Sequence, residues 1–357
     1  MTWHGIHGHD EVVESFRQRL RNGRLASTFL FVGPPGVGKR TFALKLAQAL
    51  LCERHSEVDL DPCEACPSCQ QVAAGTHPDV IYVGLEKNKS RITLAQLIGD
   101  DDKRMQEGLV HDIGLKPFGG KRRIGIIDDA DTLSAGQGES ANCLLKTLEE
   151  PPPHSVLILI GTTEQRQLPT IRSRAQVIRF APLDVETAAQ LLLEQGIASD
   201  PQHAGKLAEL SHGSLQAAQD FVDVDVQEFR VRWLRFLADP QPDSIAIAKQ
   251  MASFVDEAGK DAAPRRARMR MLAHAAIEFY RELLQVLHGQ QAAGDDHLKH
   301  AATAAARQWN RDPEVIADSI ERCLDAIQQV DANANQATLI EAWLDDLAQL
   351  RILGRIA

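Results

Sequence analysis

The sequence lacks a long hydrophobic run. Nowhere in its 357 residues do about 18 apolar residues follow one another, which is the length that a membrane-spanning helix needs. A signal peptide ahead of the first amphipathic segment is missing as well. We therefore expect no membrane span and a cytoplasmic location. Hydrophobic residues still make up 44% of the chain, so a chain of this length can form two or three domains with buried cores.

An excess of positive charge is also absent, because the formal net charge is −10. Residues 1–180 balance at 22 Lys+Arg against 22 Asp+Glu, whereas residues 181–357 carry 17 against 27. A protein that grips DNA with its whole surface would be basic. Contact with DNA would thus need a local basic patch, or a partner protein that binds the DNA.

Cysteine is scarce, with six residues, yet four of them lie within 18 positions: Cys52, Cys63, Cys66 and Cys69. Their spacing supplies four thiolates for a tetrahedral site, which favours zinc. No position is left for water, so the zinc would be structural. Disulfides are disfavoured in a reducing cytosol, and an iron–sulfur cluster remains the alternative. We expect His77 to be a hydrogen-bonded loop residue rather than a further ligand.

A phosphate-binding loop is present between residues 28 and 51. The apolar run 29–32 predicts a buried strand, and the apolar positions from 42 to 50 predict a helix. The tight loop between them contains Gly33, Gly36 and Gly38 and ends at Lys39. Such a loop turns backbone N–H groups toward a phosphate, and its lysine reaches the outer phosphates. The spacing fits this motif fully.

One residue of the motif is missing: the Ser or Thr that follows the lysine and holds Mg²⁺ through its hydroxyl. Arg40 stands in its place. Thr41 comes one residue late, about 100° further round the helix, and is a poor substitute. We favour a loop that can hold ATP or ADP but has lost its metal ligand, over one that hydrolyses nucleotide normally. Mg²⁺ is therefore doubtful as a cofactor.

An acidic pair follows about 90 residues after the loop. Residues 123–127 predict a strand that ends in Asp128 and Asp129. If this strand lies parallel and next to the loop's strand, Asp128 sits beside the nucleotide's Mg²⁺, as in a Walker B motif. Asp129 takes the place of a glutamate that often activates water, and its side chain is one methylene shorter. Strand-end acids are also common helix caps, which is the alternative.

Further strands are predicted at 77–83, 156–160 and 177–180, and helices at 10–21, 92–109 and 141–150. We expect the acidic run 100–102 to be an exposed face of its helix. A polar residue after strand 156–160 can sense a γ-phosphate, and Thr163 is the candidate. Residues 182–222 contain two short helical patterns, and residues 226–357 contain long ones without any motif. The loop 289–296 is predicted to connect two of these helices.

The segments GPPGVGK, CEACPSC, HPDV, IIDDAD, ANCLLKTLEEPP and TIRSRAQ together resemble the clamp-loader branch of the AAA+ proteins, over about residues 3–222. The four-cysteine module is similar to that of bacterial clamp loaders. The resemblance implies an α/β fold plus an all-α part. These are an AAA+ P-loop domain over 1–181 with a parallel sheet and the zinc module, a helical lid over 182–224, and a helical collar over 225–357.

The resemblance also implies a function, which is to open a sliding clamp and load it on primed DNA. The implied partners are the gamma/tau and delta clamp-loader subunits in a ring of five, the sliding clamp, and primed DNA through the complex. No membrane is involved. We interpret the chain as one component of the DNA polymerase III holoenzyme.

The site residues implied by the resemblance are Lys39, Asp128 and Thr163, which match the P-loop lysine, the Walker B aspartate and the sensor threonine. Arg174 matches an arginine that active members lend to a neighbour's ATP. Gln216 stands where the lid should carry a second sensor arginine after a Gly-Ser pair. Three extra residues within 134–140 predict a longer loop there than the family usually has.

Two functions remain open. In the first, the chain is a stator without autonomous activity, which completes a neighbour's site through Arg174. In the second, it is a gamma/tau-like motor subunit that hydrolyses ATP itself. Arg40, Asp129 and Gln216 each weaken hydrolysis at a different part of the site, which favours the stator. A AAA+ helicase or unfoldase would not explain the four-cysteine insert.

Overall fold

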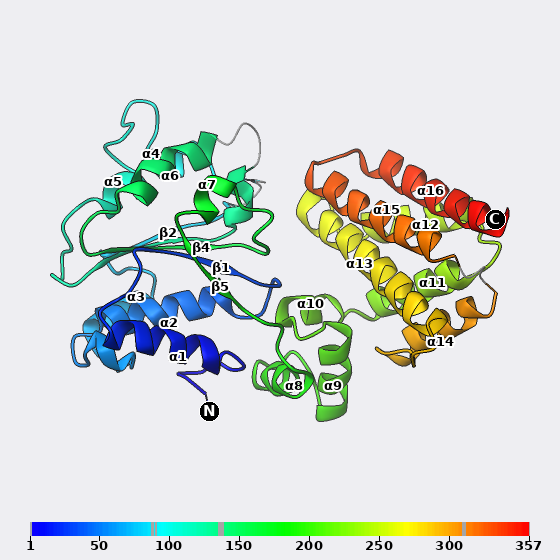
Figure 1. The fold of residues 1–357 in the computed structure, drawn as a ribbon, viewed down its shortest axis with the longest axis horizontal. Helices are drawn as coiled ribbons and strands as arrows, with labels where there is room; N and C mark the ends of the chain where they lie inside the picture. Colours follow the sequence, from blue (N-terminus) through cyan, green and yellow to red (C-terminus); the bar gives the residue numbers. More distant parts are fainter. Residues whose placement is uncertain (1, 87–88, 90, 135–138, 309–311, 357) are drawn as a thin grey trace. The chain divides into compact units, whose positions relative to one another are not determined.

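The computed structural model describes residues 2–86, 89, 91–134, 139–308 and 312–356 (Figure 1). The chain folds into two compact units. The first contains Met1–Gly196 and Ser211–Ala217, and the second contains Ile197–Leu210 and Ala218–Ala357. Each unit has its own buried residues and is described separately.

The first unit is built on a parallel sheet of five strands in the order β2-β3-β4-β1-β5. The strands are β1 (Thr28–Val32), β2 (Val80–Val83), β3 (Arg123–Ile127), β4 (Ser155–Ile160) and β5 (Gln176–Arg179). All of the predicted strands are present. The expected neighbour relation is wrong in one respect, since β4 lies between β1 and β3 and pairs with both. The carboxyl ends of these three strands still meet at one edge.

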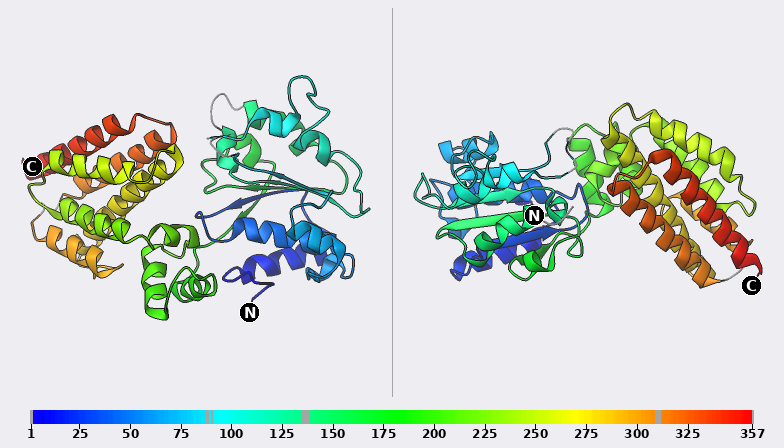
Figure 2. Two further views of the ribbon diagram at one scale, coloured as in Figure 1. Left: turned by 180° about the vertical axis from the view of Figure 1, so that it is seen from behind. Right: turned by 90° about the horizontal axis from the view of Figure 1, so that it is seen from above.

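Helices cover both faces of the sheet (Figure 2). One face carries α1 (Asp10–Arg21), α2 (Lys39–Leu51) and α3 (Pro67–Ala73). The other carries α4 (Leu94–Ile98), α5 (Leu109–Ile113), α6 (Glu139–Glu149) and α7 (Pro169–Arg172). Two 3-10 turns, η1 (Glu57–Asp59) and η2 (Ala130–Ser134), and the helix α8 (Val185–Glu194) complete the elements that lie wholly in this unit. The predicted helices 10–21 and 141–150 are confirmed by α1 and α6.

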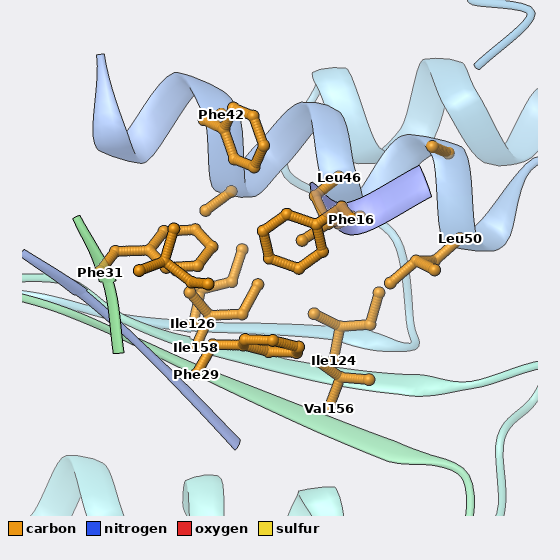
Figure 3. Packing of buried hydrophobic residues seen from close by; sticks show 14 of the residues in the cluster. Phe16, Phe29, Phe31, Phe42, Leu46, Leu50, Ile124, Ile126, Val156 and Ile158 are labelled. Atoms are coloured by element: carbon orange, nitrogen blue, oxygen red, sulfur yellow. The ribbon is translucent and has the colours of Figure 1, made fainter. Parts of the chain in front are cut away.

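Alternate residues of each strand enter two separate cores. On β1, Phe29 and Phe31 face α1 and α2, whereas Leu30 and Val32 belong to the core on the opposite face. Figure 3 shows Phe42 of α2 above the aromatic rings of the strands. The ring centroids of Phe31 and Phe42 are 5.8 Å apart. This double burial explains why the strands read as continuous apolar runs rather than as alternating ones.

The predicted helix 92–109 is wrong: the segment forms two short helices, α4 and α5, with an irregular loop between them. Gly99 ends α4 at a φ of 84°, and Gly108 precedes α5 at a φ of 91°. A Cβ on Gly108 would lie 2.7 Å from the backbone nitrogen of Gly99. Two glycines in the left-handed region thus break the helix and bring its ends together. The acidic residues 100–102 are exposed, as expected.

The second unit is helical. Its elements are α9 (Pro201–Leu210), α11 (Val224–Ala238), α12 (Ser244–Asp256), α13 (Ala262–Leu287), α14 (Asp296–Ala306), α15 (Pro313–Asp331) and α16 (Gln336–Ile356). Trp233 and Trp343 are fully buried with ring centroids 5.3 Å apart, and Trp233 Nε1 donates to the carbonyl of Leu272 at 2.9 Å. The predicted connection 289–296 is confirmed, because it joins α13 to α14.

Residues 182–222 form three helices rather than two: α8, α9 and α10 (Leu215–Asp220). The helix α8 lies in the first unit and α9 in the second. The lid boundary at 182–224 and the collar boundary at 225 therefore stay predictions. The expected longer loop at 134–140 falls mostly on residues 135–138, which lie outside the described residues. Within the described part of the chain, no helix is long and apolar enough to cross a membrane.

Phe42→Ala tests the packing of the core between α2 and the sheet. Phe42 is fully buried, and its ring centroid lies 5.2 Å from that of Phe180 and 5.3 Å from that of Trp3. We expect the substitution to lower the free energy of unfolding by about 3–5 kcal/mol, because it leaves a cavity. Urea unfolding followed by circular dichroism measures this change.

The matched control is Phe118→Ala, because Phe118 is 85% exposed. It should change the free energy of unfolding by no more than about 0.5 kcal/mol. Equal losses in the two variants would contradict the packing described here.

Candidate functional site

The phosphate loop is held in place by the segment 211–217. Ser214 Oγ donates to the carbonyl of Pro35 at 2.9 Å, and the N–H of Leu215 donates to the carbonyl of Gly36 at 3.2 Å. Gly36 has a φ of 72°, and a Cβ there would lie 2.6 Å from the backbone nitrogen of Gln216. Only glycine accepts both the conformation and this close approach.

Lys39 begins α2 and bends back over the loop. Its Nζ donates to the carbonyl oxygens of Gly33 at 2.7 Å and Pro34 at 2.6 Å. Burial lowers the pKa of Lys39 to about 8, although the charges of Asp131, Asp128 and Asp129 act in the opposite direction. The first-turn N–H groups of α2 have no intrahelical partners. The loop, the helix start and Lys39 thus form a cradle suited to phosphate.

Asp128 and Arg40 lie together at the carboxyl end of β3. Arg40 Nε is 3.8 Å from Asp128 Oδ2, and the same oxygen accepts a hydrogen bond from the hydroxyl of Tyr82 at 2.7 Å. The Arg40 guanidinium lies over the Tyr82 ring, 4.7 Å from its centroid. Partial burial and the hydrogen bond to Asp128 raise the pKa of Tyr82, so the hydroxyl stays a donor. Thr41 is exposed.

The end of β4 is organised by Asp131 rather than by Thr163. Asp131 accepts hydrogen bonds from the N–H of Thr162 at 3.0 Å and from the Thr162 hydroxyl. Gln167 Nε2 donates to the same carboxylate. Thr163 is exposed, and its Oγ1 accepts from the N–H of Arg166 at 3.3 Å. Thr163 is therefore anchored at the site's edge, and its role as a sensor stays a prediction.

The four cysteines of the module come together, with all four Sγ atoms within 4.8 Å of one another. Cys52 follows α2, and Cys66 caps α3 by accepting from the N–H of Cys69 at 3.4 Å. The N–H of His55 points to Cys52 Sγ at 3.4 Å. Burial acts to raise the pKa of Cys52, but backbone N–H groups outweigh it and lower that pKa. Four converging thiol groups of this kind fit a tetrahedral metal ion.

His77 is not part of the cluster, as predicted. Its Nδ1 accepts from the N–H of Asp79 at 3.0 Å, so the proton sits on Nε2, which faces Ser68 Oγ at 3.0 Å. Burial lowers the pKa of His77. The neutral ring links the helix α3 to the start of β2.

Arg174 follows α7 and is exposed. Its Nη2 donates to Glu149 Oε1 at 2.6 Å, and its Nη1 donates to the carbonyl of Thr170 at 3.0 Å. Glu149 ends α6 in the LEEPP segment. The guanidinium is thus fixed at the surface by two other elements of the first unit.

The structure gathers the loop glycines, Lys39, Arg40 and Asp128 at one edge of the sheet. The sequence reading missed three residues that hold this site and the arginine. They are Tyr82, Asp131 and Glu149. They lie within segments that the sequence analysis singled out, namely β2, the IIDDAD segment and the LEEPP segment, in that order. The sequence shows only where these residues stand in the chain, because their hydrogen-bond partners lie 46, 31 and 25 residues away.

A parallel α/β sheet with this strand order, a P-loop between β1 and α2 and an aspartate after β3 define an AAA+ type of domain, which a helical region follows. The family described as DNA polymerase III, delta subunit, matches residues 8–184. The chain is similar to clamp-loader subunits of the delta-prime and gamma/tau types.

Several relatives are similar to a part of this chain. The DNA polymerase III subunit tau of Escherichia coli strain K12 is 33% identical over 227 residues, which are 62% of this chain and 32% of the relative. The delta-prime subunit of Bacillus subtilis strain 168 is 32% identical over 211 residues, 58% of this chain and 57% of the relative. The delta-prime subunit of Pseudomonas aeruginosa strain PAO1 is 35% identical over 208 residues, 58% and 59% of the two chains.

The chain therefore spans less than two thirds of the length of each of these relatives. A solved gamma subunit-related protein from Thermotoga maritima is 14% identical and covers 95% of this chain and 99% of its own, with a TM-score of 0.40. A likeness at that level supports no argument about function.

The lowered pKa of Lys39 predicts a pH dependence of stability. An unfolded lysine titrates near 10.4, whereas Lys39 titrates at about 8 in the fold. Between these values the unfolded chain binds more protons, so the free energy of unfolding rises with pH. We subtract the free energy of unfolding of Lys39→Met from that of wild type. This signed difference should rise by up to about 1.4 kcal/mol per pH unit in this window. Urea unfolding at several pH values measures it, and a flat or falling difference would contradict the burial of a charged Lys39.

Proposed function

We propose that the chain is a subunit of the DNA polymerase III clamp loader, which helps to open the sliding clamp and load it on primed DNA during replication. It works in the cytoplasm with gamma/tau and delta subunits and reaches DNA through the complex. Its similarity to delta-prime and tau subunits over 208 to 227 residues supports this role.

Within the complex the chain acts as a stator of the delta-prime type. Its own ATP hydrolysis is weak or absent, and it has no autonomous enzymatic activity. The observation that carries this proposal is the placement of Arg40, which stands where a motor subunit needs a hydroxyl and faces the Walker B carboxylate at 3.8 Å. Asp129 and Gln216 remove two further groups that a motor needs. The loop still offers glycines and Lys39 to ATP or ADP.

The stator serves a neighbour through Arg174. A guanidinium presented across a subunit boundary stabilises the charge that develops on the γ-phosphate, and in the best-studied GTPases it is worth on the order of 10³–10⁵ in rate. Such a residue must be exposed, and it must be held before the neighbour arrives. Arg174 meets both needs, since Glu149 and the carbonyl of Thr170 fix its exposed side chain.

The four-cysteine cluster holds one structural zinc ion. Four thiolates with no open position supply stability rather than catalysis. The module is tied into the first unit on several sides: Trp3 Nε1 donates to the carbonyl of Leu60 at 2.8 Å, and Arg122 forms two hydrogen bonds with Glu57 at 2.7 and 2.9 Å. The helical residues 182–224 and 225–357 serve as lid and as the collar that joins the ring.

The zinc site predicts a metal content of one ion per chain. Cys66→Ser removes one thiolate from the centre of the cluster, and we expect it to lose most of the zinc and to lower the melting temperature of the first unit. Elemental analysis and thermal unfolding measure the two effects. Cys143→Ser is the control, because Cys143 lies on α6 outside the cluster, and it should retain the metal. Purified protein without zinc, or with iron and visible absorbance, would contradict the assignment.

Arg174→Ala tests the stator role. We expect the variant to fold and to join the complex, but to lower the ATPase activity and clamp loading of the assembled complex by about tenfold or more, because the neighbour loses its trans charge. Reconstitution with purified partners, followed by ATPase and clamp-loading assays, measures this. Wild-type chain alone should show negligible turnover.

Arg172→Ala is the matched control, since it removes a second exposed arginine two residues away. It should leave loading within about twofold of wild type. Unchanged loading with Arg174→Ala in an intact complex would refute the stator. Turnover by the isolated chain, abolished by Lys39→Ala, would favour a gamma/tau-like motor instead.

A further inference from the structure

The metal position of the phosphate loop does not fit Mg²⁺. This ion requires near-octahedral oxygen ligands, and in P-loop proteins it takes them from a Ser or Thr after the lysine and from the Walker B aspartate. Arg40 offers no oxygen. Asp128 Oδ2 already accepts from the Tyr82 hydroxyl at 2.7 Å and has the Arg40 cation 3.8 Å away. A divalent cation at this carboxylate would meet a positive charge at close range.

The position of Arg40 is one from which a cationic side chain can bind a phosphate. It is the second residue of α2 and follows Lys39, so both side chains start from the turn that borders the phosphate cradle. The guanidinium lies 4.7 Å from the centroid of the Tyr82 ring, which limits its orientation. Its side chain is 61% exposed and thus open to a ligand. A planar guanidinium binds phosphate oxygens in pairs, which a point charge does not.

We infer that this loop takes a nucleoside polyphosphate without a divalent metal, with Arg40 supplying the positive charge that Mg²⁺ supplies elsewhere. Lys39 and the first-turn N–H groups of α2 hold the phosphates, and Arg40 pairs with their outer oxygens. Asp128 and Tyr82 keep the guanidinium in position. The nucleotide then acts as a structural ligand that is retained and not turned over. The inference rests on the proposed function only in taking a nucleotide to be the loop's ligand.

The test is a binding titration of the full chain with a fluorescent N-methylanthraniloyl derivative of ADP, in EDTA and in MgCl₂. Unlabelled ADP, ATP, pyrophosphate and adenosine serve as competitors and show which part of the nucleotide is recognised. For wild type we expect saturable binding whose affinity differs by less than about threefold between the two buffers. Lys39→Ala should remove binding in both, which assigns the signal to this loop.

Arg40→Thr supplies the hydroxyl that the motif lacks. We expect it to weaken binding in EDTA by about tenfold or more, which corresponds to the loss of one charge-assisted hydrogen bond, and to recover affinity in MgCl₂. Arg40→Gln removes the charge without supplying a metal ligand, so binding should stay weak in both buffers. Arg24→Thr removes an exposed arginine outside the loop and should stay within about threefold of wild type. Circular dichroism melts verify that each variant is folded.

Three results would overturn the inference: binding by wild type that requires MgCl₂, no saturable binding in either buffer, or equal affinity of wild type and Arg40→Thr in EDTA. None of them touches the stator role, because that role is tested by Arg174→Ala in the assembled complex. Conversely, metal-independent binding by this chain would stand even if Arg174→Ala left clamp loading unchanged.

Discussion

The parallel sheet of the first unit must be buried on both faces, and the candidate site depends on this constraint. Parallel strands need crossover connections, which place helices on both faces. Because every strand runs in the same direction, the carboxyl ends of β1, β3 and β4 open toward one edge. The loop before α2, the Asp128 carboxylate and the Thr162 turn therefore meet without being neighbours in sequence. Phe16, Phe29 and Phe42 fix the distance between α2 and the sheet, and with it the position of the loop.

Charge decides what this edge can do. The cradle keeps the lysine and the backbone donors of a nucleotide site, but at the metal position it exchanges an oxygen ligand for the guanidinium of Arg40. The substitution reaches further than one residue, because Tyr82 both supports the guanidinium and donates to Asp128. Arg40, Tyr82 and Asp128 contact one another, so this site has gained a set of interactions where a site that had only lost its metal ligand would have none. The site keeps the groups that bind a phosphate, and these are distinct from the metal ligand that phosphoryl transfer needs.

Most of the first unit could be predicted from sequence, because its strands are continuous apolar runs and its loop has a fixed glycine spacing. The four cysteines were found for the same reason, since ligand spacing is local. The helix at 92–109 was misread because two glycines act through left-handed backbone, which apolar periodicity does not report. Glu149 and Tyr82 could not be assigned, because each acts through a partner brought near only by the fold. The lid boundary at 182–224 rests on the family resemblance and on helical pattern, and the first unit recruits residues 211–217 from within it.

That recruitment has a consequence for how the protein is made. The carbonyl of Pro35 receives its hydrogen bond from Ser214, which lies 179 residues further along the chain. During synthesis the sheet and its two cores can assemble as their strands emerge, but the phosphate loop gains this support only after residue 214 has left the ribosome. This hydrogen bond of the phosphate loop can therefore form only after all five strands have been translated. A nascent chain interrupted before that point would carry the whole sheet with a loop that lacks this hydrogen bond.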